Sequence, residues 1–164
     1  MIYRRAIAGL ALVLTAFGPG IQADAATTSV PRTTLHELHT VIRSQKDLRA
    51  YLETASRTAS PLAALSPTGR QRFLSSLSFN KRGVSGFEYG ALKAELSYSQ
   101  IYQVLGLFGK AEDASLISGA RVGNAADRAI MVSPRPLGDH PNYYCQYGGG
   151  TCAPAYNYIC TYTC

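Results

Sequence analysis

All four cysteines of this 164-residue chain lie in its last 20 positions, and this crowding constrains the fold more than any other feature. They are Cys145, Cys152, Cys160 and Cys164. An even number of cysteines in a short, loop-rich segment is typical of a disulfide framework in an exported protein. We therefore expect residues 142–164 to form a compact tail with two disulfides.

The end of the tail has the pattern of a β-strand. Residues 156–164 alternate tyrosine or cysteine with asparagine, isoleucine or threonine, and strict period-two alternation of such residues predicts a strand. Residues 142–147 would form its partner strand. The three glycines between the two segments, residues 148–150, would form the turn, since glycine adopts backbone angles closed to other residues.

This strand narrows the disulfide pairing. Residues four apart in an extended strand are separated by about 13 Å, whereas bridged cysteines need Cα atoms within about 7 Å. Cys160 and Cys164 should therefore pair with Cys145 and Cys152, in an order that the sequence leaves open. Zinc is the alternative, but zinc ligands usually come in pairs two to four residues apart. Here the gaps are six, seven and three residues, which favours disulfides.

Six of the eleven tyrosines also fall in the tail, which has no charged side chain after His140. The candidate partner contacts are Tyr143, Tyr144, Tyr147, Tyr156, Tyr158 and Tyr162. Tyrosine offers a large amphipathic face at low entropic cost, which suits recognition. Alternatively, the rings pack across the strands and against the rest of the chain. The sequence leaves both possibilities open.

The start of the chain has the parts of a signal peptide in their usual order. Two arginines precede an apolar run at 6–17, and Ala23 and Ala25 fit the cleavage pattern. The run is shorter than the about 20 residues that a membrane-spanning helix needs. We expect residues 1–25 to be removed, leaving a periplasmic or secreted protein without a transmembrane anchor.

The middle of the chain predicts helices. Helix starts are indicated by a serine, threonine or asparagine cap with a polar partner three residues on, or by Ser-Pro. They stand at Thr34–Glu37, Ser44–Asp47, Ser66–Pro67, Ser97–Gln100 and Asn124–Asp127. Further helix is expected at 87–96 and 111–118, and a short loop at 84–87. The predicted fold class is mainly α: a small helical bundle followed by a disulfide-stapled β-hairpin-like tail.

Composition divides the chain into five expected segments. They are a signal peptide (1–25), a disordered lead-in (26–33), a helical domain (34–132), a proline-rich linker (133–141) and the cysteine- and tyrosine-rich tail (142–164). The tail is expected to be a structural unit of its own.

The net charge of +6 suits anionic partners, but the basic residues are spread along the chain. The densest group, Arg70, Arg72, Lys81 and Arg82, is interpreted as a solvated face. We expect no nucleic-acid partner; a protein or a cell-envelope polymer is the expected class.

No motif names a reaction, so the protein is expected not to be an enzyme and to need no cofactor or metal. His36 and His39 flank Glu37 but miss the metalloprotease spacing by one residue, which leaves only a weak metal site with His140. Ser78 and Lys81 match one element of penicillin-binding proteins without its companions. The acidic side chains Glu88, Glu95, Glu112 and Asp113 look exposed and scattered, so no carboxylate pair can be nominated for acid–base catalysis.

Three functions remain. The leading hypothesis is an exported, non-enzymatic scaffold that presents the stapled, tyrosine-rich tail for interaction. The second is a secreted antibacterial or host-directed factor whose tail is released from a helical carrier at the compositional break between Pro134 and Pro141. The third is a periplasmic hydrolase or metal-binding protein.

Overall fold

The computed structural model describes residues 41–55, 59–147 and 150–164. The expected signal peptide, the expected lead-in and the first expected helix start, Thr34–Glu37, lie outside these residues. The described residues all belong to one compact unit. Its elements are α2 (Gln45–Thr54), η2 (Pro61–Ala64), α3 (Pro67–Ser76), β1 (Ser78–Asn80), β2 (Gly83–Glu88), α4 (Gly90–Glu95), α5 (Tyr98–Gly106), η3 (Ala111–Leu116), α6 (Ala125–Met131), β3 (His140–Cys145) and β4 (Cys152–Cys160).

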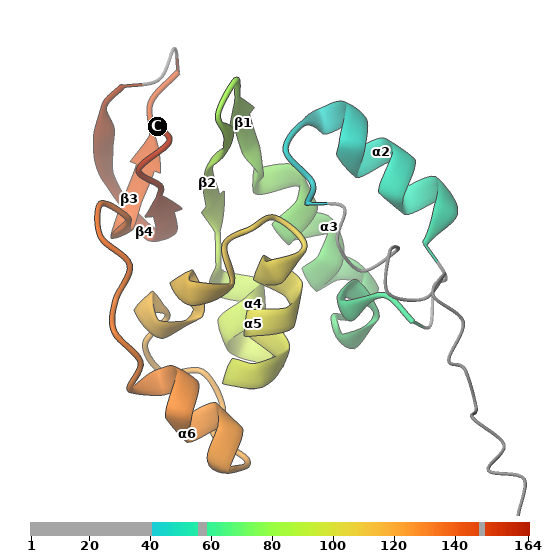
Figure 1. Ribbon diagram of the computed structural model, residues 1–164, viewed down its shortest axis with the longest axis vertical. Helices are drawn as coiled ribbons and strands as arrows, with labels where there is room; N and C mark the ends of the chain where they lie inside the picture. The colour runs from blue at the N-terminus through green and yellow to red at the C-terminus, as the bar shows by residue number, and fades with distance from the viewer. Residues whose placement is uncertain (1–40, 56–58, 148–149) are drawn as a thin grey trace, which may run out of the picture. The chain divides into compact units, whose positions relative to one another are not determined.

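The fold is mixed α/β, so the prediction of a mainly α protein is wrong. Four strands form one antiparallel sheet in the order β1-β2-β4-β3 (Figure 1). Strand β2 was expected to be a loop. Five of its six residues are buried, so it lacks the alternation of buried and exposed positions by which a strand is usually recognised.

The tail is joined to this sheet rather than standing apart from it. Strand β4 pairs with β2, with Gly86 opposite Cys160 and Phe87 opposite Ile159. A Cβ on Gly86 would lie 3.0 Å from the carbonyl oxygen of Ile159. Glycine at this position therefore lets β4 approach β2 closely.

Several predicted helix starts are confirmed, because their caps are local. Ser66 Oγ accepts from Gly69 N at 3.0 Å, and Asn124 Oδ1 accepts from Asp127 N at 2.9 Å. The Ser97 capping box is also present. Other boundaries differ: the expected helix at 87–96 begins only at Gly90, and 111–118 contains a 3₁₀ helix. Among the described residues, none of the helices combines the length and apolar character needed to cross a bilayer.

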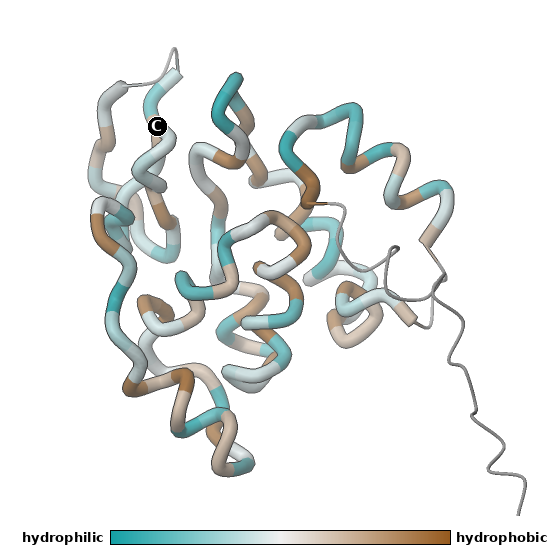
Figure 2. Tube along the Cα trace, viewed as in Figure 1, coloured by the Kyte–Doolittle hydropathy of each residue, from teal (hydrophilic) through white to brown (hydrophobic). Residues whose placement is uncertain are grey.

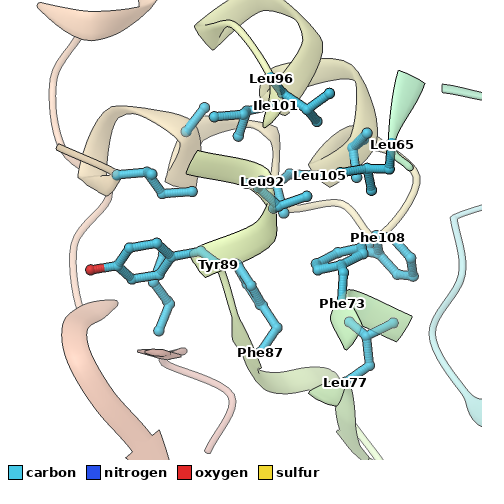
Figure 3. Packing of buried hydrophobic residues seen from close by; sticks show 14 of the residues in the cluster. Leu65, Phe73, Leu77, Phe87, Tyr89, Leu92, Leu96, Ile101, Leu105 and Phe108 are labelled. Atoms are coloured by element: carbon cyan, nitrogen blue, oxygen red, sulfur yellow. The ribbon is translucent and has the colours of Figure 1, made fainter. Parts of the chain in front are cut away.

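The core lies where the helices meet β2 and β4. The ring of Phe73 packs edge-on against Phe108 and Phe87, at centroid distances of 5.7 and 6.1 Å (Figure 3). Ile159 of the tail is fully buried in the same cluster. The tail thus supplies part of the core of the body. Tyr89 lies at the margin of this core, with its hydroxyl pointing away from Phe73.

Helix α6 is fastened to α5 through one carboxylate. Asp127 Oδ1 accepts from Ser99 N at 2.7 Å, and Oδ2 accepts from Gly123 N at 2.8 Å. These hydrogen bonds, those from Ser99 first, hold the pKa of Asp127 well below its usual range.

Candidate recognition surface on the stapled hairpin

The hairpin β3–β4 is sharply bent at two asparagines. Asn142 and Asn157 have φ values of 66° and 64°, in the left-handed region that asparagine tolerates better than most residues. Asn142 Oδ1 accepts from Asn157 N at 3.3 Å and from the Tyr89 hydroxyl at 2.9 Å. The register slips at the same point, so residues 155–158 of β4 face a single residue of β3. The bend folds the hairpin back on itself.

The bend explains the disulfide pattern. Cys152 and Cys160 lie in the same strand, where an extended chain would separate them by about 26 Å, yet they are bonded, with Cα atoms 5.9 Å apart. The second disulfide joins Cys145 to Cys164, with Cα atoms 5.6 Å apart. The prediction that Cys160 and Cys164 pair with the two earlier cysteines is confirmed, and the order is now resolved.

The strand predicted to run to residue 164 ends at Cys160 instead. Residues 161–164 form a turn in which Cys164 N donates to the Thr161 carbonyl oxygen at 2.8 Å. Sulfur atoms of Cys145, Cys160 and Cys164 lie within 4.8 Å of one another, so the two disulfides are neighbours. Because all four cysteines are bonded in pairs, none remains as a thiolate ligand for the zinc alternative.

The turn between β1 and β2 holds the end of the tail. Asn80 Nδ2 and Arg82 Nη2 both donate to the Thr163 carbonyl oxygen, the latter at 2.8 Å. Thr161 Oγ1 donates to the Val84 carbonyl oxygen at 2.7 Å. Together with β2–β4 pairing, these bonds fix the hairpin to the body.

The tail tyrosines lie mostly on the surface. Tyr147 is fully exposed, and the exposed fractions are 40% for Tyr143, 39% for Tyr144, 76% for Tyr156 and 64% for Tyr162. Tyr158 is half-buried, and its ring lies edge-on to Tyr144 at 6.5 Å. The alternative that the rings are mostly packed away therefore applies to Tyr158, while the other five remain available to a partner.

A groove of about 890 Å³ runs between the β1–β2 hairpin and the tail. It is lined by residues 78–82 and Ser85 on one side and by residues 144–147, Gly150 and Cys164 on the other. Lys81 and Arg82 are exposed at its rim. In Figure 2 the tip of the β1–β2 hairpin is hydrophilic, whereas the facing hairpin is largely pale with some brown and teal stretches.

A buried charged cluster lies where the tail meets η3. Lys110 Nζ lies 3.1 Å from Asp139 Oδ2, and both side chains are almost fully buried. Asp139 Oδ1 accepts from Tyr162 N, and Lys110 Nζ lies 4.1 Å from the centre of the Tyr162 ring. Burial, and after it the neighbouring Asp139, raises the pKa of Asp113 to about 8.

The structure corrects one prediction about the acidic residues and shows the surroundings of His140 and Ser78. Asp113, expected to be exposed, is 1% exposed. His36 and His39 lie outside the described residues, and His140 is exposed beside Tyr143. Ser78 Oγ donates to the Gly86 carbonyl oxygen at 3.1 Å and bonds to Ser85 Oγ, so the hydroxyl is committed to the β1–β2 pair rather than to Lys81.

Sequence reasoning missed the groove and the buried cluster. Lys81 and Arg82 were recognised only as part of a solvated face, because nothing in their local sequence shows that the tail lies opposite. Lys110 and Asp139 are 29 residues apart. The one signal in the sequence is that Asp139 is the last acidic residue before the uncharged tail.

In comparisons with known proteins, no protein-family model, no curated protein and no solved structure matches the chain. Any functional argument therefore depends on the site itself.

Proposed function

We propose that this protein is an exported binding protein, in which a mixed α/β body presents the bent, stapled hairpin as a tyrosine-rich recognition surface for a component of the cell envelope. The observation that carries the proposal is the exposure of five tail tyrosines on a backbone fixed by two disulfides. A partner can then bind without having to order the hairpin first, which removes a large part of the usual cost of association.

Export is supported by independent features. The first 25 residues have the order of a signal peptide, and the disulfides fit an oxidising compartment such as the periplasm or the exterior. The chain would then meet its partner where envelope polymers and surface proteins are found.

The packing favours this function over release of the tail as a separate peptide. Strand β4 pairs with β2, and Ile159 is buried among the side chains of the body. Cleavage between Pro134 and Pro141 would therefore leave the tail held by the sheet and by the core. The exposed tyrosines act in the intact protein.

The test is the binding of the purified, oxidised protein to isolated cell envelopes. Replacing Tyr143, Tyr144 and Tyr156 by serine should weaken binding by tenfold or more, because a few aromatic side chains usually supply most of the affinity at an interface, with about 1 kcal/mol or more each. The matched control is Tyr102→Ser on α5, since Tyr102 is 43% exposed but lies outside the tail. Equal binding by the triple variant and the unaltered protein, or no binding by either, refutes the proposal.

A further inference from the structure

We propose that the groove between the β1–β2 hairpin and the tail binds an acidic polysaccharide. This inference rests on the proposed function and names the class of partner for the same hairpin.

The charge of the groove selects anions. Lys81 and Arg82 stand at its rim, and none of its described lining residues carries a carboxylate side chain. The tail contributes no charged side chain from Pro141 onward. Arg82 uses one donor on the Thr163 carbonyl oxygen, and a guanidinium has five, so it keeps donors for a carboxylate.

The opposite side of the groove suits sugar rings. Tyr144 and Tyr147 line it and are both exposed, Tyr147 completely. A tyrosine ring offers a flat apolar face together with a hydroxyl at the wet end, which matches a sugar with an apolar face and a polar rim. Gln146, which lies between them in the sequence, also lines the groove and adds an amide that both donates and accepts hydrogen bonds.

An acidic peptide fits less well, because neither edge of the sheet is a good template for strand addition. Edge strand β1 has only three residues, with a register shift between Ser78 and Phe79. The other edge, β3, is bent at Asn142. Peptides that add to a sheet need a straight row of free backbone donors and acceptors, and an acidic glycan does not.

The experiment compares four probes by isothermal titration at low and high salt. They are defined oligogalacturonates, the same oligomers with their carboxylates methyl-esterified, poly-glutamate and single-stranded DNA. The proposal predicts that the oligogalacturonates bind best, that esterification weakens binding and that salt weakens it as well.

The matched variants remove two positive charges inside and outside the groove. Lys81→Gln with Arg82→Gln should weaken oligogalacturonate binding about tenfold, the value expected for two exposed ion pairs of up to 1 kcal/mol each. Lys46→Gln with Arg49→Gln on α2 changes the net charge equally and should leave binding unchanged. Because Arg82 also holds Thr163, the single variant Lys81→Glu carries the same prediction without touching that bond.

Each other outcome overturns the inference. Equal binding of the esterified oligomers would mean that the carboxylates of the glycan do not contribute to binding. Stronger binding of poly-glutamate or DNA would mean that the partner belongs to another class. An equal loss of oligogalacturonate affinity in the groove variant and the α2 variant would mean that binding depends only on the net charge of the protein. In each case envelope binding that still depends on the tail tyrosines would leave the proposed function standing, so the two failures are distinguishable.

Discussion

At the scale of single residues, the contact between Lys110 and Asp139 helps to hold the last residues of the tail. Asp139 pairs with Lys110 through one carboxylate oxygen and accepts from Tyr162 N with the other. Asp113 beside them is buried, and its Oδ2 has no hydrogen-bond partner among the described residues. Because Asp113 is buried beside Asp139, and Lys110 is paired with Asp139, the favourable state at neutral pH keeps Asp113 protonated.

This protonation makes stability depend on pH. The pKa of Asp113 is about 8 in the folded protein, against 3.8 for an unperturbed aspartate. A raised carboxyl pKa means that the folded state holds a proton that the unfolded state releases. Its favourable contribution is therefore complete below about pH 4 and decreases as pH rises to about 8.

Asp113→Asn should remove this dependence, because an amide stays neutral and still offers a donor toward Asp139. We expect the gain in stability over the unaltered protein to be larger at pH 8.5 than at pH 4.5 by at least about 1 kcal/mol. Chemical denaturation at the two pH values measures the difference. Equal effects at both would show that Asp113 is ionised in the folded protein.

At the scale of elements, the helix starts were predictable and the strands of the body were not. A cap such as Asn124 with Asp127 involves residues three apart, so a short sequence window contains the whole interaction. Strand β2 exists because β1 and β4 pair with it, and β4 is more than 60 residues away. The tail hairpin was predicted from its alternation and cysteines, but its bend was not. Asparagine at 142 and 157 allows the left-handed conformation without requiring it, so these residues alone do not predict a bend.

The two disulfides should contribute unequally to stability. Cys145 and Cys164 are 19 residues apart, and Cys152 and Cys160 are 8 apart. Cross-linking restricts the unfolded chain more when the loop is longer. Replacing both cysteines of the first pair by alanine should cost about 3 kcal/mol, and of the second about 2.5 kcal/mol.

Urea denaturation of the two double variants measures these losses against the unaltered oxidised protein. Both variants retain one disulfide, so each serves as the control for the other. A stability equal to that of the unaltered protein in both would show that the tail is not held by these bonds.

At the scale of the whole molecule, the change in composition after residue 140 predicted a separate tail, and the fold combines tail and body in one sheet. Composition reports charge and residue type, but it does not report that Ile159 fills a place in the core beside Phe87. The groove arises from this union, because one side comes from β1–β2 and the other from the tail. Neither half of the chain has it alone, which is why sequence patterns did not reveal it.

We propose that the exposed tyrosines of the hairpin are the contact surface of the intact protein, and side-chain footprinting on cell envelopes measures that contact. Hydroxyl radicals should label the five exposed tail tyrosines and Tyr102 in the free protein. On isolated envelopes, we predict that labelling falls in the tail and is unchanged at Tyr102. Unchanged labelling of the tail tyrosines on envelopes that bind the protein, or equal protection of Tyr102, would contradict the claim.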